Sequence, residues 1–481
     1  MLSCIMRFLN RNEELARLNR AAAGEGAALV VLYGRRRIGK TRLLLEWSTK
    51  TGGLYTVADQ SAAEIQRRYF AGAVAERLPG FAEVDYPDWW SLFSRLARDA
   101  ERSGWRGPLI LDELPYLVAA SPEIPSLLQR WLDHDARQAR LTVALAGSSQ
   151  RMMQGLVLGA DAPLYGRVTE LLDLGPIEPS YLGEVFPGRD DAALVQLYAA
   201  WGGVPRYWEL AKGLEMDVHQ QVDQLVLDPL APLHREPDRL LLEELPPAVE
   251  TRPVLDAIGA GAHRVSEIAG RLGRPATSMA RPLGRLIGMG LVRRDIPFGE
   301  TEKKSRRGLY RIDDPFFRLW FRVVAPHRGV LTASSRRARL QLLEKYWPGL
   351  AAEAWEELCR RRLPFLSERT PLLSEHGPWG PASRWWRGNE AEWDLVSLSL
   401  DSKRILLGEA KWSSGPFGAR EVSKAASKLR GRPPPSALSV PADTKVHRVL
   451  LVPALDRQAE AALPRDGDLI VVTARDILGG A

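Results

Sequence analysis

The sequence predicts an α/β protein of several domains, with a mostly parallel sheet first, then a helical segment, a winged helix-turn-helix and a second α/β domain. Three observations support this prediction. Apolar runs alternate with amphipathic helical patterns up to about Leu174. The pattern is then helical from about Glu178 to Glu250. Strand patterns return in residues 291–312 and again beyond residue 390. We expect boundaries at residues 1–175, 176–250, 251–330 and 331–481.

Composition fits a soluble, multidomain chain. The chain has 481 residues, of which 45% are hydrophobic and 26% charged, and this length suggests two to four domains. No apolar run approaches the roughly 20 residues of a membrane span, and the N-terminus lacks the layout of a signal peptide. The two cysteines, Cys4 and Cys359, form no framework or metal cluster, so we expect a reduced, cytoplasmic compartment.

The first elements lead to a glycine-rich loop. Residues 8–18 place apolar side chains at helical spacing after a cap-like Asn10, which predicts a helix, and residues 28–33 read as a buried strand. The next eight residues match G-x-x-x-x-G-K-[ST] at every fixed position, and residues 42–47 read as the following helix. The loop consists of Gly34, Arg35, Arg36, Arg37, Ile38, Gly39, Lys40 and Thr41.

This strand–loop–helix unit predicts a site for ATP. Backbone N–H groups and the positive end of a helix converge on one spot, which suits the β- and γ-phosphates of a nucleotide. We expect Lys40 to neutralise these phosphates and Thr41 to ligate Mg²⁺. The alternative is a chance glycine-rich turn before a helix, and the agreement of strand, loop and helix argues against it.

A second apolar strand, residues 107–113, ends in Asp112 and Glu113. In P-loop ATPases an Asp at such a strand end holds Mg²⁺ through water, and a following Glu polarises the attacking water. Many strands end in Asp, so this run is weak evidence by itself, but it follows Lys40 by 72 residues, a spacing that suits the fold.

Two further residues are candidates for contact with the nucleotide. Residues 141–146 read as a buried strand that ends at Gly147, and the hydroxyl of Ser148 is placed to sense the γ-phosphate. A polar loop after a strand explains Ser148 equally well. Arg167 is a candidate for a phosphate contact in its own subunit or in a neighbouring one, and its alternative is a surface charge.

Residues 178–250 predict a small helical lid with a turn at residues 201–207, followed by a proline-rich, acidic linker. Residues 251–325 then read as a winged helix. We expect helices at residues 253–258, 266–272 and 275–289, the second capped near Ser266 or Val265. Wing strands are expected at residues 291–294 and 309–312. Pro282 lies inside the third helix, where it would kink or shorten it.

The net charge of +7 is unevenly distributed. Residues 251–330 hold 16 Lys or Arg and 7 Asp or Glu, a net +9, so the remainder is close to −2. This segment is therefore the expected site for a polyanion. In a helix-turn-helix the recognition helix enters the DNA major groove. The alternative is a protein-binding or interdomain module with a solvated wing. The candidate nucleic-acid contacts are Arg274, Arg281, Arg285, Lys303, Lys304, Arg306 and Arg307.

The last domain contains the layout of a metal-dependent nuclease. Asp394 opens one strand, and Glu409 and Lys411 lie two residues apart on another, so their side chains share a face. Two carboxylates hold Mg²⁺ in such a site, and the lysine orients or activates water. Glu356, on a predicted helix at residues 351–362, is a candidate to complete the metal shell. An acidic and basic alternation is also common on exposed strands, so this pattern is weak alone. Closing strands are expected at residues 449–453 and 468–473.

The order of these motifs resembles one family across nearly the whole chain: the prokaryotic, archaeal-type P-loop ATPases of the AAA+/STAND branch that carry a C-terminal DUF234 domain. The resemblance implies an ATPase core, a winged helix and a C-terminal domain similar to restriction-endonuclease-like PD-(D/E)XK nucleases. Two positions depart from the family, Trp393 and Ala410, and neither replaces a proposed ligand. The resemblance rests on residues 8–15, 34–41, 111–113, 147–149, 163–167, 202–205, 310–314, 355–356, 392–394 and 408–412.

Three functions compete. The first is an ATP- and Mg²⁺-dependent hydrolase that controls a nucleic-acid-handling C-terminal region. The second is a non-enzymatic regulator that binds ATP and DNA, with a decayed nuclease fold as a binding platform. The third is a scaffold whose nucleotide state controls homo-oligomerisation and whose winged helix binds protein. Asp112 and Glu113 favour hydrolysis over binding alone, and Asp394, Glu409 and Lys411 favour a working nuclease.

Overall fold

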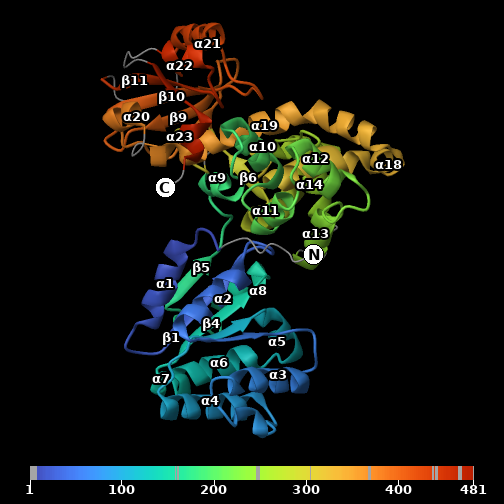
Figure 1. The fold of residues 1–481 in the computed structure, drawn as a ribbon, viewed down its shortest axis with the longest axis vertical. Helices are drawn as coiled ribbons and strands as arrows, with labels where there is room; N and C mark the ends of the chain where they lie inside the picture. The colour runs from blue at the N-terminus through green and yellow to red at the C-terminus, as the bar shows by residue number, and fades with distance from the viewer. Residues whose placement is uncertain are drawn as a thin grey trace. The chain divides into compact units, whose positions relative to one another are not determined.

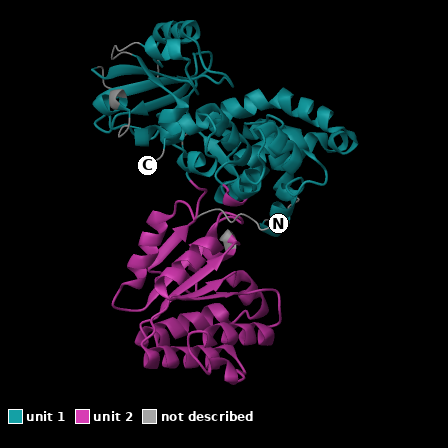
Figure 2. Cartoon of the chain, viewed as in Figure 1, with its two compact units in different colours: residues 1–6, 178–203, 207–481 teal, residues 7–177, 204–206 magenta. Residues whose placement is uncertain are grey.

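The structure is a computed structural model, and it describes residues 8–157, 159, 162–244, 250–303, 305–366, 370–435, 438, 443–463 and 469–479. The chain forms two compact units (Figures 1 and 2). The N-terminal unit comprises residues 7–177 and 204–206. The C-terminal unit comprises residues 1–6, 178–203 and 207–481. Of the residues described, none lies in a helix long and apolar enough to cross a membrane.

The N-terminal unit is built on a five-stranded sheet of order β2-β3-β4-β1-β5, in which every pair is parallel. Parallel strands need crossover connections, and helices supply them here. The strands are β1 (Ala28–Tyr33), β2 (Leu54–Val57), β3 (Leu109–Asp112), β4 (Thr142–Gly147) and β5 (Glu170–Asp173). The helices are α1 (Asn12–Ala22), α2 (Lys40–Thr51), α3 (Ala63–Ala75), η1 (Phe81–Glu83), α4 (Trp89–Ser103), α5 (Leu114–Ala120), α6 (Ile124–Asp133), α7 (Asp135–Gln138) and α8 (Gln150–Val157).

The core of this unit explains why its strands read as continuous apolar runs. All six residues of β1 are buried, as expected for a sheet covered on both faces. Leu29, Val31 and Tyr33 belong to a core that also contains Trp89 of α4 and Trp131 of α6. Because β1, β3 and β4 are parallel neighbours, their carboxyl ends meet at one edge of the sheet. The predicted ATP site lies at that edge.

The first helix begins later than its sequence pattern predicts. Helix α1 starts at Asn12, and its N-cap is Arg11, which has a φ of 75° and makes no side-chain cap hydrogen bond. Asn10 also has a positive φ, of 57°. The prediction of Asn10 as the cap was therefore wrong, because this turn is held by contacts of Arg11 with the rest of the unit.

The C-terminal unit begins with the predicted helical segment. A turn separates α10 from α11 between Trp201 and Pro205, as the sequence predicts, and Trp201 and Trp208 are fully buried. The elements are η2 (Pro179–Tyr181), α9 (Leu182–Val185), α10 (Asp191–Trp201), α11 (Pro205–Lys212), α12 (Val218–Val222), η3 (Asp223–Leu227) and α13 (Glu236–Glu244).

The elements of the predicted winged helix follow in the expected order. Its strands pair antiparallel, with Val292 opposite Ile312. Its third helix is shorter than the predicted residues 275–289, because a 3-10 turn precedes it and Pro282 occupies its first turn. A proline is tolerated there, since the first N–H groups of a helix have no intrahelical partner. The elements are α14 (Arg252–Gly259), α15 (Val265–Arg271), η4 (Ala276–Met279), α16 (Ala280–Gly288), β6 (Val292–Asp295) and β7 (Leu309–Ile312).

Helix α15 begins next to the residues that the sequence predicts near its cap. The N-cap residue is Arg264, and Ser266 and Val265 lie inside the helix. The Glu267 carboxylate accepts hydrogen bonds from the backbone N–H groups of His263 and Arg264, at 2.8 and 3.0 Å. A carboxylate in the first turn thus satisfies donors that a serine cap would otherwise serve.

The last domain contains a mixed five-stranded sheet of order β12-β11-β10-β9-β8, in which β10, β11 and β12 are parallel and β8 and β9 antiparallel. The predicted helix 351–362 is part of a 31-residue helix, α19. The elements are α17 (Pro315–Leu319), η5 (Trp320–Val324), α18 (Ala325–Ala333), α19 (Arg336–Leu366), α20 (Pro371–His376), β8 (Ser383–Trp385), β9 (Trp393–Leu398), β10 (Arg404–Ala410), α21 (Ala419–Gly431), β11 (Lys445–Leu451), α22 (Arg457–Ala461), β12 (Leu469–Val472) and α23 (Ala474–Leu478).

Candidate ATP site and basic surfaces

The glycine-rich loop joins β1 to α2 at the carboxyl edge of the N-terminal sheet. Gly34 has a φ of 151°, and a Cβ there would lie 2.6 Å from the carbonyl oxygen of Leu174, so no larger residue fits. Gly39 is the N-cap of α2, with a φ of 97°. The Lys40 ammonium donates hydrogen bonds to the carbonyl oxygens of Gly34 and Arg35, at 2.7 and 3.2 Å. The loop thus curls around its own lysine, in the shape that surrounds a phosphate group.

Two arginines connect this loop to the rest of the N-terminal unit. The Arg11 guanidinium is buried and donates to the carbonyl oxygens of Ile38 and Gly175, at 3.1 and 2.6 Å. Arg36, inside the loop, donates to the Tyr116 hydroxyl at 3.0 Å. Arg11 therefore fixes the end of the loop before α2, a role that its place in the sequence does not reveal.

Thr41 and Asp112 meet although 71 residues separate them. The Thr41 hydroxyl donates to Oδ2 of Asp112 at 2.8 Å, and the Tyr55 hydroxyl donates to the same oxygen at 2.8 Å. Burial raises the pKa of Tyr55 well above its ordinary value, and the Asp112 carboxylate raises it further. A hydroxyl and a carboxylate are the hard oxygen donors that Mg²⁺ prefers, so this pair fits the expected metal.

An uncommon backbone conformation sets the direction of the Glu113 side chain. Its φ is 53°, in the left-handed region, and its backbone N–H donates to Oδ1 of Asp112 at 2.9 Å. The Ser148 hydroxyl donates to Oε2 of Glu113 at 3.0 Å. Ser148 follows β4 and Glu113 follows β3, so neighbouring parallel strands bring the two together. Strained backbone of this kind is typical of functional sites.

Arg167 lies elsewhere. Its guanidinium forms a two-pronged ion pair with the Asp133 carboxylate, at 2.7 and 2.8 Å, on the surface of the N-terminal unit. Its predicted phosphate contact inside the same subunit would require this ion pair with Asp133 to break, and that contact stays a prediction. A contact with a neighbouring subunit's nucleotide stays a prediction.

The proposed nuclease residues lie close together, and each already has an ion-pair or hydrogen-bond partner within the protein. Glu409 forms ion pairs with Lys411 and with Arg432, which follows α21 and lies over the Trp393 ring at 4.9 Å. Oδ2 of Asp394 accepts the backbone N–H of Ala410 at 3.0 Å. Burial, and then the negative charges of Glu356 and Glu409, raise the pKa of Asp394 to about 6.

Glu356 does not complete a metal shell in this arrangement. It pairs with Arg360 at 3.4 Å. The part of the chain that the structure describes contains no group of three His, Cys, Asp or Glu placed to hold a metal ion. Lys411 and Arg432 pair with Glu409, and Arg360 pairs with Glu356, so the binding of a metal by Asp394, Glu409 and Glu356 stays a prediction.

The winged helix has less free positive charge than its sequence suggests. Arg293, Arg311, Arg318 and Arg322 point inward and form ion pairs with Glu353 and Glu357 of α19. Arg285 pairs with Glu250 at 3.0 Å, and Arg307 pairs with Glu300. Arg274, Arg281, Lys303 and Arg306 are exposed. Lys304 lies outside the described residues.

The wing also contacts the last domain. The backbone N–H of Phe298 donates to the carbonyl oxygen of Arg384 in β8 at 2.8 Å, and the Phe298 side chain packs against the core of that domain. The wing is thus attached at its base. Of the predicted nucleic-acid contacts that are exposed, Arg274 lies just before η4, Arg281 lies on α16, and Lys303 and Arg306 lie at the wing tip.

Sequence reasoning missed three residues that matter at these sites: Tyr55, Arg11 and Arg432. Each acts through a partner far away in the sequence, and no short-range pattern marks a lone tyrosine in a strand or an arginine before a helix. Their roles depend on which strands and loops the fold places side by side.

Two segments of the chain match known domain families. Residues 8–207 match a model described as an ATPase domain predominantly from Archaea. Residues 320–426 match DUF234, described as archaeal and bacterial proteins of unknown function. An uncharacterized protein of Methanocaldococcus jannaschii is 29% identical over 424 residues, which cover 87% of this chain and 90% of that protein. An uncharacterized ATP-binding protein of the same organism is 52% identical over 40 residues, 8% of this chain and 68% of that protein.

Solved structures show more distant similarity. The Walker-type ATPase of Pyrococcus abyssi is 18% identical, with a TM-score of 0.49 over 66% of this chain and 96% of that one. The ORC2 protein of Aeropyrum pernix, in complexes with ADPNP and ADP, is 15% identical, with a TM-score of 0.42 over 71% of this chain and 95% of that one. At these identities and scores, neither structure informs the function of this chain.

Proposed function

We propose that this chain, in which residues 8–207 match an ATPase domain found mainly in Archaea and residues 320–426 match DUF234, hydrolyses ATP with Mg²⁺. The residues around the Thr41–Asp112 hydrogen bond perform the reaction. That hydrogen bond, 2.8 Å long, is the observation that carries the proposal. It joins the end of the phosphate loop to the end of β3, which is the pairing that a magnesium nucleotide requires.

Each residue has a role that follows from its place. Lys40 leaves the carbonyl oxygens of Gly34 and Arg35 and turns to the β- and γ-phosphates. Thr41 and Asp112 hold the metal, which would neutralise charge on the phosphates when bound. Glu113 accepts a hydrogen bond from water and orients it toward the γ-phosphate. Ser148, which donates to Glu113, is free to exchange that acceptor for a phosphate oxygen.

The test separates binding from turnover on the full chain. Lys40→Ala should lose ATP binding, measured by calorimetry. Glu113→Gln should bind ATP normally and release phosphate about 10²- to 10⁴-fold more slowly, because the carboxylate acts on water. Glu123→Gln, an exposed glutamate before α6, is the matched control and should hydrolyse at the wild-type rate. Wild-type hydrolysis by Glu113→Gln, or hydrolysis that persists after chelation of divalent ions, would refute the assignment.

A second function is nucleic-acid binding by the C-terminal unit. It is supported by the exposed cations Arg274, Arg281, Lys303 and Arg306 on one module. Glu409, which strand cleavage would require as a metal ligand, pairs with Lys411 and Arg432.

Salt dependence tests this second function. Contacts with phosphates release counterions, so DNA affinity should fall steeply as salt rises. Joint replacement of the four exposed cations by Ala should weaken binding and flatten the slope by about 0.9 for each phosphate that the variant no longer neutralises. An unchanged slope would favour a protein-binding scaffold. Metal-dependent cleavage that disappears in Asp394→Ala and Glu409→Ala would instead establish a nuclease.

A further inference from the structure

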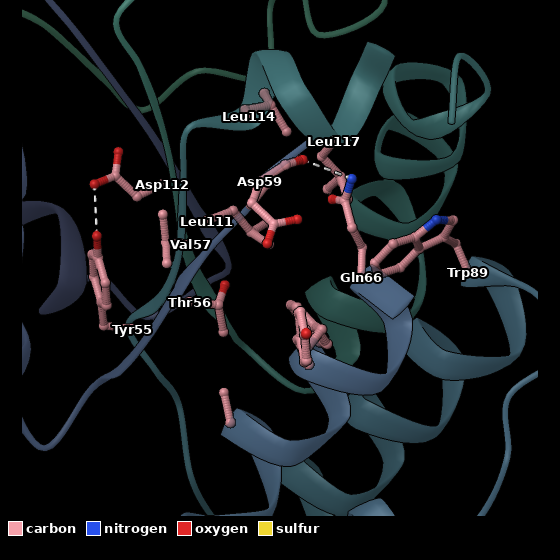
Figure 3. A pocket seen from close by; sticks show the side chains of 14 residues that line it. Tyr55, Thr56, Val57, Asp59, Gln66, Trp89, Leu111, Asp112, Leu114 and Leu117 are labelled. Carbon is pink, nitrogen blue, oxygen red and sulfur yellow. Dashed lines mark hydrogen bonds between the residues drawn. The ribbon is translucent and has the colours of Figure 1, made fainter. Parts of the chain in front are cut away.

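A cavity of about 330 Å³ lies behind the ATP site, inside the N-terminal unit (Figure 3). Residues of β2 and β3 line one side, and residues of α3, α4 and α5 line the other. Asp112 and Tyr55 form part of its wall, so the cavity adjoins the proposed metal site. Its volume falls at the lower end of small-molecule sites, which begin at about 300 Å³.

The walls combine apolar bulk with negative charge. Tyr69, Phe70 and Trp89 supply aromatic surface, and several aliphatic residues surround them. The charged lining residues are two carboxylates, Asp59 and Asp112, and none of the fourteen described lining residues is Lys, Arg or His. A neutral apolar ligand would not neutralise the two carboxylates, and they would repel an anion.

The Gln66 amide in the cavity wall is satisfied at its nitrogen end. The side chain is 4% exposed, and its Nε2 donates to the carbonyl oxygens of Asp59 and Ser61, at 3.0 and 2.8 Å. Those two acceptors fix which end of the amide is nitrogen. Its Oε1 finds no hydrogen-bond partner within the part of the chain that the structure describes. A buried acceptor without a donor is costly, and a ligand that carries a donor would satisfy it.

The mouth of the cavity remains charged at neutral pH. Hydrogen bonds from the Ser61 hydroxyl and backbone N–H hold the pKa of Asp59 below its ordinary value. Figure 3 shows the Asp59 carboxylate between the strand residues and Gln66, across from Trp89. Asp59 therefore lies where a cation at the end of an aromatic or aliphatic body would meet it.

We propose that this cavity binds a small organic cation with an apolar, aromatic-sized body: an amphipathic amine whose ammonium faces Asp59 and whose donor reaches Gln66 Oε1. The site is separate from the phosphate loop, and binding to it does not depend on hydrolysis. A consequence that does rest on the proposed ATPase function is regulation. An ammonium at Asp59 adds positive charge to a cavity whose wall includes Asp112, and this charge opposes the binding of Mg²⁺ to the Asp112 carboxylate.

Three probes that share an indole ring but differ in charge test which ligand the cavity prefers. Tryptamine, indole and indole-3-acetate are titrated calorimetrically into the full chain without nucleotide. Tryptamine should bind saturably in the millimolar range or tighter, as expected for a ligand of this size. Indole should bind more weakly, and indole-3-acetate most weakly. Equal affinities, or no saturable binding of tryptamine, would overturn the proposal.

Variants locate the binding. Asp59→Asn keeps the oxygen that accepts the Ser61 N–H and should reduce tryptamine affinity to that of indole while leaving indole unchanged. Asp85→Asn, an exposed aspartate outside the cavity, should change neither. Ala73→Trp fills the cavity and should abolish binding of all three probes, with circular dichroism confirming that the variant is folded. Undiminished tryptamine binding in Asp59→Asn, or in folded Ala73→Trp, would refute the site.

A second measurement isolates regulation from binding. Saturating tryptamine should raise several-fold the Mg²⁺ concentration that gives half-maximal ATP hydrolysis, and Ala73→Trp should be insensitive to it. An unchanged Mg²⁺ dependence in a chain that binds tryptamine would refute regulation and leave the site standing. Absence of hydrolysis under every condition would refute the ATPase proposal while the calorimetric result stands by itself.

Discussion

At the scale of single residues, Asp112 is held by two hydroxyls rather than one. Thr41 is expected from the motif, whereas Tyr55 comes from the edge strand β2 and donates to the same carboxylate oxygen at 2.8 Å. A group that orients a metal ligand without touching the metal typically contributes 10- to 100-fold, as a rough guide, to metal affinity or activity. Tyr55 is therefore a positioning residue for the proposed reaction.

Tyr55→Phe tests this role. The substitution removes one hydroxyl and leaves the Thr41–Asp112 hydrogen bond in place. We expect ATP binding without Mg²⁺ to stay at the wild-type level, while the Mg²⁺ concentration for half-maximal hydrolysis rises by about tenfold or more. Tyr69→Phe, which removes a hydroxyl from an exposed tyrosine nearby, is the control. Equal Mg²⁺ dependence in wild type and Tyr55→Phe would contradict the assignment.

At the scale of elements, buried ion pairs connect α19 to the segment predicted as a winged helix. Glu357 is 3% exposed and pairs with Arg318 at 2.5 Å and Arg293 at 2.9 Å, and Tyr198 donates to it at 3.0 Å. Burial would raise the pKa of Glu357, but Arg361, Arg293 and Arg318 outweigh burial and lower the pKa well below its ordinary value. Burial likewise would raise the pKa of Glu353, but Arg318, Arg322 and Arg311 outweigh burial and lower it.

The sign of the pH dependence follows from this shift. A glutamate whose folded-state pKa is depressed stabilises the fold at a pH above its unfolded pKa of about 4.3, and the contribution is lost as pH falls below that value toward the folded-state pKa. Glu357→Gln should therefore lower the free energy of unfolding by about 3 to 5 kcal/mol at pH 7, because it removes a buried negative charge from between the Arg318 and Arg293 guanidinium groups.

Urea unfolding monitored by circular dichroism measures this effect. The difference between wild type and Glu357→Gln should be full at pH 7 and smaller below pH ~4. Glu344→Gln, on an exposed part of the same helix, should change the midpoint little at either pH. A Glu357→Gln variant as stable as Glu344→Gln at pH 7 would show that the ion pairs contribute specificity rather than stability.

At the scale of the whole molecule, the chain divides into two compact units. The proposed ATP site lies in the N-terminal unit and the exposed cations in the C-terminal one. A ligand stabilises the unit that binds it by mass action. We expect ATP with Mg²⁺ to raise the midpoint of one thermal transition of Glu113→Gln, by about 2.7 kcal/mol of stabilisation at 100 times the dissociation constant.

Calorimetric scans of Glu113→Gln check this expectation, because that variant is expected to retain ATP. Duplex DNA should raise the midpoint of the other transition if the C-terminal unit binds it. The Lys40→Ala variant should lose the shift with ATP and keep the shift with DNA. A single transition that both ligands raise together would show that the two units unfold cooperatively.

Local pattern determined much of this protein by itself. The phosphate loop, the strands that end at Asp112 and Gly147, and the wing strands follow from short-range signals: apolar runs, fixed glycine positions and helical periodicity. Each such signal reflects a local backbone requirement, such as the positive φ of 97° at Gly39, the residue that precedes α2. The ATPase domain is therefore evident from the amino-acid sequence alone.

Tertiary structure decided which charges are used. The sequence shows a basic winged helix, yet four of its arginines face Glu353 and Glu357, and Arg432 reaches Glu409 from beyond α21. Tyr55 joins Asp112 across 57 residues of sequence, a separation that no periodicity spans. Charge and hydrogen bonding depend on separation in space, and in this chain only packing sets that separation.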